Sequence, residues 1–170
     1  MAIKNEPSVK DNKEINVLRS QMQQRAQWLY FIVDEMKKRG IDYEPIVRDA
    51  IYRVGCFRGA QTVSAFKDKG DLIELGDSFE KHMNRIAFEK EFVCKSENCL
   101  EMHFHHCPLV EGWMQVTDDE ELIAKLCDIA MDGDRGIFSN VPGAEFILDG
   151  TIAEGQPVCK LIVRKKTEEQ

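Results

Sequence analysis

Residues 88–109 read FEKEFVCKSENCLEMHFHHCPL, and this stretch decides the fold class. Aromatic and branched side chains recur at two-residue steps on both sides of the polar segment 95–98, which has the composition of a turn. Alternation with a period of two is typical of a β-strand with one buried face. The stretch therefore predicts a β-hairpin with strands at about 86–94 and 98–106, the second of which is ended by Pro108.

The chain before this hairpin has the three- and four-residue periodicity of amphipathic helices. One helix is predicted at 14–38 and a second at about 43–55. A third helical segment begins near Asp71 or Asp77. Residues 1–13 are polar and charged, and we expect them to form a flexible arm.

One further helix and two further strands are predicted after the hairpin. The stretch TDDEELIAKLCDIAMDGD (117–134) predicts a helix with Thr117 as its N-cap in a capping box. GAEFILDG (143–150) and PVCKLIVRKK (157–166) predict two short strands. Helices followed by a mostly antiparallel sheet with one inserted helix define an α+β fold, and we expect residues 14–170 to form a single domain.

The composition is that of a folded acidic protein, with 170 residues, a formal net charge of −7 and 43% hydrophobic residues. This charge disfavours nucleic acids and anionic membranes as partners, and no apolar run approaches the ~20 residues of a membrane span. Because the N-terminus lacks the apolar core of a signal peptide, we expect a cytoplasmic protein whose six cysteines stay reduced. The stretch WLYFIV (28–33) is apolar on nearly all sides of its helix, which favours a homodimer.

Three of the four histidines and one cysteine fall within residues 103–107. Alternate side chains of a strand share a face, so one face would carry Met102, Phe104 and His106, and the other Glu101, His103, His105 and Cys107. The second set allows three interpretations. The histidines only pair across the hairpin, or His103, His105 and Cys107 bind zinc, or Cys107 is a reactive thiol whose proton a nearby histidine accepts.

Two later segments add further groups of this kind. In LCDIAMDGDRG (126–136), Cys127 lies on one helical face, while Asp132 and the carboxylate one turn before it share an adjacent face. Two neighbouring carboxylates repel each other, so a positive side chain, a substrate amine or a metal would stabilise them. In TIAEGQPVCKLIV (151–163), a glycine turn leads into a strand that carries Cys159.

Three features follow one another along the chain: Cys107 with a tryptophan shortly after it, the stretch LCDIAMDGD, and the segment that ends at Cys159. This ordered set resembles the L-2-amino-thiazoline-4-carboxylic acid hydrolase family. The resemblance covers about residues 40–166. Members of this family, small proteins often seen in anaerobic bacteria, open the thiazoline ring of a cysteine precursor to give a carbamoyl-cysteine product. The family also looks distantly like the vinyl-reductase-type small-ligand domains, so a non-catalytic or metal-dependent ligand-binding domain is the alternative.

The resemblance implies a hydrolase that acts on a C–N bond of a small cyclic amidine without a resident cofactor, with zinc as the alternative. The catalytic residues expected for this reaction are Cys107, Asp132 and Cys127, which match the family, together with His105 from the histidine-rich strand. Cys107, or a water activated by His105, would attack the ring carbon, and Asp132 would pair with the protonated amidine. The substrate-binding residues that it implies are His103, Trp113, Arg135 and Cys159.

Overall fold

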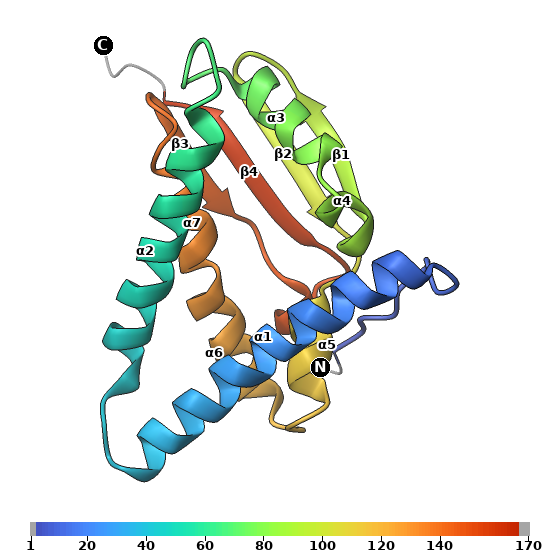
Figure 1. Ribbon diagram of the computed structural model, residues 1–170, viewed down its shortest axis with the longest axis vertical. Helices are drawn as coiled ribbons and strands as arrows, with labels where there is room; N and C mark the ends of the chain where they lie inside the picture. The colour runs from blue at the N-terminus through green and yellow to red at the C-terminus, as the bar shows by residue number, and fades with distance from the viewer. Residues whose placement is uncertain (1–2, 167–170) are drawn as a thin grey trace.

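The computed structural model describes residues 3–166 and shows a four-stranded sheet with helices against one of its faces (Figure 1). Each strand is antiparallel to its neighbours, in the order β1-β2-β4-β3. The strands are β1 (Lys90–Lys95), β2 (Cys99–Phe104), β3 (Ala144–Leu148) and β4 (Cys159–Lys165). β1 and β2 form the predicted hairpin, and β3 and β4 are the two predicted C-terminal strands.

The face of the sheet that packs against the helices, here called the inner face, is set by the register of the strands. Lys90 on β1, Phe104 on β2 and Cys159 on β4 lie side by side in one row. The next row contains Phe92, Met102 and Leu161. The outer face carries Glu101, His103 and Lys160, which are half-buried. The sheet therefore has the apolar and polar faces that strict alternation predicts.

Helices surround this inner face and confirm the α+β fold class, with the N-terminal helices first in the chain. The helices are α1 (Lys13–Lys38), α2 (Tyr43–Val63), α3 (Leu72–Lys81), α4 (Asn84–Ala87), α5 (Pro108–Met114), α6 (Glu120–Ala130), α7 (Asp132–Phe138) and the 3₁₀ turn η1 (Ile152–Glu154). The helix predicted at 14–38 matches α1 within one residue, whereas α2 continues eight residues past its predicted end.

The segment between β2 and β3 differs from its prediction, because it holds α5, α6 and α7 in place of one helix. β2 ends at Phe104, and α5 begins directly at Pro108, since a proline is well accommodated in the first turn of a helix. The N-cap of α6 is Asp119 in place of Thr117, with the Asp119 side chain accepting the Leu122 N–H at 3.0 Å. A carboxylate at this position also favours the positive end of the helix dipole.

Glycines on both helices allow α2 and α7 to pack with their backbones in contact. A Cβ atom on Gly55 or Gly59 of α2 would overlap the carbonyl oxygens of Gly133 or Ile137 on α7. In the reverse direction, a Cβ atom on Gly136 would overlap the Tyr52 carbonyl oxygen. Because neither helix carries a side chain at these points, α7 lies between α2 and the sheet (Figure 1).

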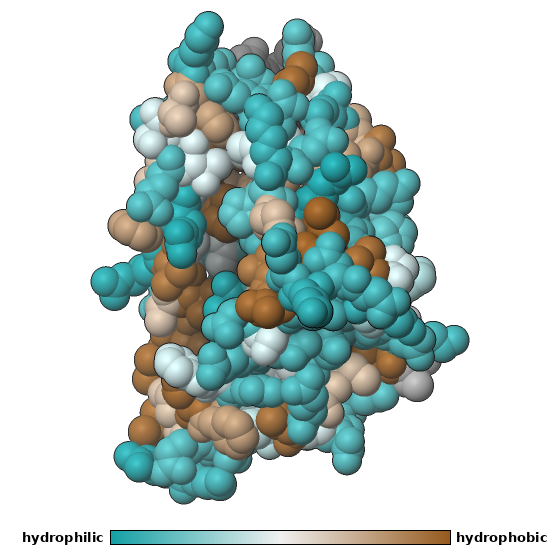
Figure 2. Space-filling view, turned by 45° about the vertical axis from the view of Figure 1, so that its right-hand side comes forward, coloured by the Kyte–Doolittle hydropathy of each residue, from teal (hydrophilic) through white to brown (hydrophobic). Residues whose placement is uncertain are grey.

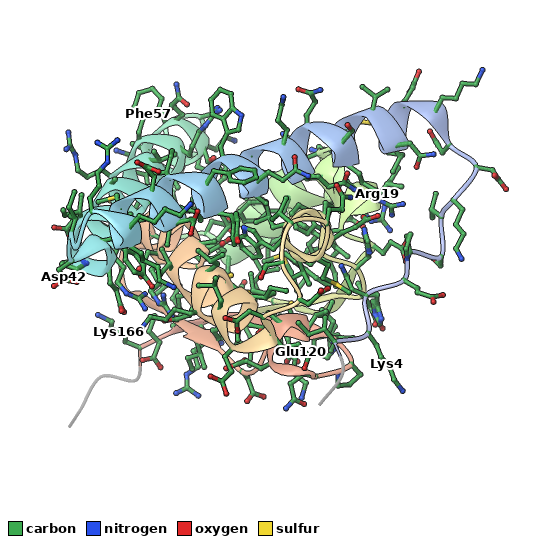
Figure 3. The ribbon with its side chains drawn as sticks, turned by 90° about the horizontal axis from the view of Figure 1, so that it is seen from below. Lys4, Arg19, Asp42, Phe57, Glu120 and Lys166 are labelled. Atoms are coloured by element: carbon green, nitrogen blue, oxygen red, sulfur yellow. The ribbon has the colours of Figure 1, made fainter. Side chains whose placement is uncertain are left out.

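The N-terminal arm, predicted to be flexible, is attached to the domain by several hydrogen bonds. The Asn5 side chain donates to the Cys107 carbonyl oxygen at 2.9 Å and accepts the Cys107 N–H at 2.8 Å. The Glu89 carboxylate accepts N–H groups of Ser8 and Val9, and it pairs with Arg19 at 2.9 Å. Arg19, on the side of α1 that faces the arm (Figure 3), is only 3% exposed. The arm therefore covers the region where β2 passes into α5.

An apolar surface lies on the far side of α1 and α2 from the sheet. Its residues are each more than half exposed: Trp28, Phe31 and Ile32 on α1, and Ile46, Val54 and Phe57 on α2. Figure 2 shows hydrophobic atoms along the edge where α2 lies, and Phe57 points away from the sheet in Figure 3. Within the stretch 28–33, one side of the helix is thus exposed, whereas Val33 belongs to the core of this chain. Among residues 3–166, none of the helices combines the length and the apolarity that crossing a membrane requires.

We expect Gly55→Ala to lower the free energy of unfolding by about 2–3 kcal/mol, because the new methyl group must push α2 and α7 apart. Gly133→Ala is the matched control, since its Cβ would meet only Ile51 Cγ2 at 3.5 Å, an ordinary contact. That variant should be neutral or gain up to about 1 kcal/mol from the higher helix propensity of alanine. Urea unfolding of both variants measures the difference, and equal effects would contradict the packing argument.

We expect Glu89→Gln to lower the free energy of unfolding at pH 7 by about 2–3 kcal/mol. Burial acts to raise the pKa of Glu89, but hydrogen bonds from Ser8, Val9 and Arg19 outweigh it and lower the pKa from 4.5 to about 2. This stabilisation is complete above the unfolded pKa and is lost as the pH falls from about 4.5 to 2, so the variant should approach the parent protein at low pH. Glu91→Gln, at an exposed site, is the control.

Candidate active site

Three cysteines from distant parts of the chain meet at one end of the inner face. Cys107 is the N-cap residue of α5, Cys127 lies in α6, and Cys159 begins β4. They are 6%, 5% and 5% exposed. The pKa of Cys127 is raised by burial and then by the proximity of Cys107 and Cys159, so the three thiols share one interior region. The structure thus brings together the three cysteines that were singled out in the sequence.

Burial keeps these three thiols protonated in the free protein. It raises the pKa of Cys107 to about 11, although backbone N–H groups of Val110 and Leu109 at the start of α5 act in the opposite direction. Burial, followed by the proximity of Cys107, raises the pKa of Cys159, whose sulfur accepts the Ile152 N–H at 3.2 Å. Of the three thiols, Cys107 is the one next to two backbone N–H groups, while the nearby charges act in opposite directions: Asp134 raises its pKa and Arg25 lowers it.

Lys90 adds a cation to the same end of the inner face, next to Phe104 and Cys159 in the strand register. Its ammonium nitrogen lies 4.5, 5.3 and 5.6 Å from the ring centroids of Phe104, Phe79 and Phe88. Burial lowers the pKa of Lys90 to about 8, and Asp134 acts against this shift. Cation–π attraction to the three rings stabilises the ammonium in part.

Asp134, in the first turn of α7, is the acidic group that faces this lysine. Burial raises the pKa of Asp134 to about 6, while Lys90, Arg25 and Arg135 act to lower it. Asp134 in turn raises the pKa values of Cys107 and Cys159, which places its carboxylate near both thiols. The site therefore combines neutral thiols with an acid and a base whose pKa values lie on either side of neutrality, an arrangement typical of active sites.

Aromatic rings extend the site along the inner face, which Figure 1 shows between α7 on one side and α3 and α4 on the other. Phe88 packs on Phe104 with centroids 5.3 Å apart, and Phe79 meets Phe138 edge-on at 5.9 Å. Phe138 then stacks on Phe146 of β3 at 4.9 Å. The ionisable groups are thus bordered by an apolar wall that lowers the local dielectric constant and strengthens their interactions.

The histidines do not join this site, so the predicted placement of His105 beside Cys107 is wrong. His103 lies on the outer face and contacts Glu101 at 2.7 Å, and His105 is exposed and contacts Glu91 at 2.9 Å. The alternation stops because β2 ends at Phe104 and the chain turns inward before Cys107. His103, His105 and Cys107 therefore do not converge as zinc ligands, and residues 3–166 contain no group of three His, Cys, Asp or Glu side chains arranged to hold a metal.

His106 is fully buried, and Cys107 next to it is buried as well, so burial does not separate the two residues as strand alternation predicts. Its ring nitrogen Nε2 lies 3.2 Å from the Glu111 carboxylate without a well-aligned hydrogen bond. Burial and then Arg19 lower the pKa of His106, which favours the neutral imidazole.

Two of the proposed site residues belong to an ion-pair network beside the thiols. Arg135 contacts Asp132 at 2.7 Å and Asp128 at 2.9 Å, and Arg48 of α2 contacts Asp132 at 2.9 Å. The positive groups that the two carboxylates require are therefore arginines of the chain itself. Trp113 is 1% exposed and donates its Nε1–H to the Ala26 carbonyl oxygen at 2.8 Å, so it fixes α5 to α1 in the core.

Lys90 and Asp134 are the site residues that the sequence analysis missed. Lys90 lies between Phe88 and Phe92 at two-residue steps, so the alternation already placed a lysine on the apolar side of β1. Asp134 follows Cys127 by seven residues, a spacing that keeps two residues on one side of a helix. Both signals were present in the sequence, but neither indicates how deeply the charged groups are buried.

Comparison with known proteins gives a family and a fold. A family model described as L-2-amino-thiazoline-4-carboxylic acid hydrolase matches residues 21–163. No curated protein matches the chain. Among solved structures, the chain is similar to trafficking protein particle complex subunit 3 from Naegleria fowleri covalently bound to palmitic acid, with 15% identity and a TM-score of 0.56 over 88% of this chain and 97% of that one. This likeness shows a shared fold alone. By its match over residues 21–163, the chain belongs to the L-2-amino-thiazoline-4-carboxylic acid hydrolase family.

Proposed function

We propose that the protein is a hydrolase that opens the ring of a small cyclic amidine, of the 2-amino-thiazoline-4-carboxylate kind, to a carbamoyl-cysteine-type product. One observation carries the proposal: Cys107 lies in a buried site with Asp134, a carboxyl group whose pKa of about 6 suits proton transfer near neutrality. Family membership supports the substrate class. The ligand is then a small molecule, and the reaction requires no resident cofactor.

Cys107 is the proposed nucleophile, because its sulfur is the one best surrounded by groups that stabilise negative charge. The thiol would lose its proton as the sulfur adds to the ring carbon between sulfur and nitrogen. The N–H groups at the start of α5 and the charge of Arg25 favour the developing thiolate. The bond from this carbon to the ring nitrogen then breaks, which opens the ring, and the departing nitrogen takes up the proton that the thiol lost. Water attacks the same carbon, releases the carbamoyl product and restores the Cys107 thiol, so one water is consumed in each cycle.

Asp134 replaces Asp132 as the proposed partner of the protonated amidine. Asp132 is already neutralised by Arg48 and Arg135, whereas no ion pair within 4.0 Å engages the Asp134 carboxylate among residues 3–166. An ionised Asp134 would attract the amidinium form, in which the ring carbon is most electrophilic. It would also accept the Cys107 proton and return it to the departing atom. Cys127 and Cys159 complete the wall around the reacting carbon.

The alternative is a non-catalytic small-ligand-binding domain. The structural neighbour with the same fold is covalently bound to palmitic acid, and the aromatic wall next to Cys107 is apolar enough to hold a nonpolar ligand. A binding domain of this kind would take up a ligand saturably without releasing a product. We further propose that the protein acts in the cytoplasm and that the apolar surface of α1 and α2 forms a homodimer.

We expect Cys107→Ala to lower kcat/KM for 2-amino-thiazoline-4-carboxylate by at least about 100-fold, the usual contribution of a positioned catalytic group. Cys56→Ala is the matched control, because Cys56 lies on α2 beside Ser139 and outside the proposed site. Its activity should equal that of the parent protein. Product formation can be followed by mass spectrometry. Saturable binding without product in the parent protein would favour the binding domain, and full activity of Cys107→Ala would exclude the thiol as nucleophile.

We expect kcat/KM to fall as the pH decreases through about 6, because protonation removes the charge of Asp134 that attracts the amidinium. Above this pH the carboxylate is ionised and the rate should level off. Asp134→Asn should lower the rate and abolish this acidic limb, whereas Asp149→Asn, at an exposed position on the outer face, should leave it in place. An acidic limb that persists in Asp134→Asn would assign the titration to another group.

A further inference from the structure

The ammonium group of Lys90 lacks the partners that a buried cation requires. An ammonium has three N–H donors and no acceptor. Three faces of phenylalanine surround it, and among residues 3–166 no carboxylate lies within 4.0 Å and no hydrogen-bond acceptor is engaged. Leaving a charge unpaired in an apolar environment is strongly destabilising. A half-buried lysine of this kind is therefore poorly explained by stability, because an apolar side chain at position 90 would serve the fold better.

Asp134 is the complementary group. It lies on α7 and interacts electrostatically with Lys90 of β1, but the two do not form an ion pair within 4.0 Å. The Lys90 backbone is held by the sheet, and the Asp134 backbone by a helix whose position is fixed by its glycine contact with α2. Both Lys90 and Asp134 retain some accessible surface, so neither is sealed inside the core.

The other cations near the site are accounted for differently. Arg135 and Arg48 are neutralised by Asp128 and Asp132. Arg25 faces Asp134 and Cys107, but its side chain belongs to an exposed residue of α1. Lys90 is thus the cation within the aromatic wall that is free to receive an anion.

We infer that Lys90 and Asp134 form a two-point site for a small zwitterion, in which Lys90 binds the carboxylate and Asp134 binds the cationic nitrogen. This inference rests on the proposed function and specifies its substrate class: a flat or compact ring that carries a carboxylate and a cationic nitrogen. Such a ligand would supply the acceptors that Lys90 lacks and a donor for Asp134. The rings of Phe79, Phe88 and Phe104 would cover its apolar edge.

Three five-membered rings that cannot undergo the proposed hydrolysis test this site separately from catalysis. L-Proline carries both charges, pyrrolidine carries only the cation, and cyclopentanecarboxylate carries only the anion. In calorimetric or NMR titrations of the full chain at pH 7, we expect proline to bind at least about tenfold more tightly than either singly charged ring, since losing one buried charge pair typically costs more than this. Similar affinities for all three, or no binding of proline, would overturn the inference.

Two variants test which residue binds the carboxylate of the ligand and which binds its cationic nitrogen. Lys90→Met should reduce proline affinity to that of pyrrolidine and leave pyrrolidine binding unchanged, whereas Asp134→Asn should reduce proline affinity to that of cyclopentanecarboxylate. Lys160→Met is the matched control, because Lys160 follows Cys159 on β4 but points to the outer face, and it should bind proline normally. Lys90→Met should also unfold at a higher temperature than the parent protein at pH 7, since it removes an unpaired buried charge. Normal proline binding by Lys90→Met would overturn the assignment.

Different results would exclude the zwitterion site and the hydrolase activity. Proline binding that requires Lys90 and Asp134, together with no turnover of any thiazoline, would keep the zwitterion site and exclude the hydrolase. Turnover of 2-amino-thiazoline-4-carboxylate at the parental rate and KM by Lys90→Met would keep the hydrolase and exclude Lys90 as its carboxylate-binding residue. Carboxylate affinity should also weaken as the pH rises through about 8, because Lys90, which faces Asp134, then loses its charge.

Discussion

The backbone contact between α2 and α7 is the constraint on which the rest of the structure depends. Helices with ordinary side chains pack with their axes 8–10 Å apart, whereas the glycines of these two helices leave no Cβ atoms between the two backbones. This close approach brings Asp132 within reach of Arg48, so that α7 and α2 are also joined by an ion pair. It also fixes the first turn of α7 over the sheet, and with it the direction of Asp134. The charged part of the candidate site is therefore a consequence of how closely two helices pack.

The charged residues of the site are of two kinds, those that form ion pairs and those that do not. Asp132 and Arg135 are mutually satisfied and partly exposed, and they hold α7 to α2 and α6. Asp134 and Lys90 are half-buried and do not form an ion pair, at a net loss of stability that other packing must offset. Stability and activity often oppose each other at such positions. Asp132, which looks functional in the sequence, therefore has a structural role: its ion pairs hold in place the helix that carries Asp134.

Periodicity predicted most of the fold, because the residues that create it face one shared core. The helix at 14–38, the hairpin and the two C-terminal strands follow from apolar spacing alone. The histidines were assigned to the wrong side, because alternation applies only while the chain remains extended, and β2 ends three residues before Cys107. Pro108 was read as the end of a strand, although it also begins α5. The environments of Lys90 and Asp134 depend on the electrostatic interaction of one residue on β1 with another on α7, far apart in the chain, which no local pattern describes.

The Asn5 side chain forms two hydrogen bonds to the backbone of Cys107 across a separation of 102 residues. A contact between such distant residues closes a large loop and costs chain entropy. Other contacts offset this cost only once the intervening chain is ordered. The backbone at Cys107 is therefore expected to reach its final position late in folding, after the sheet and helices have formed. A chain whose N-terminal segment has not yet docked would hold a nearly complete domain with its central thiol still unplaced. Maturation of the site is in this sense controlled by a segment that is synthesised about 100 residues before the cysteine it positions.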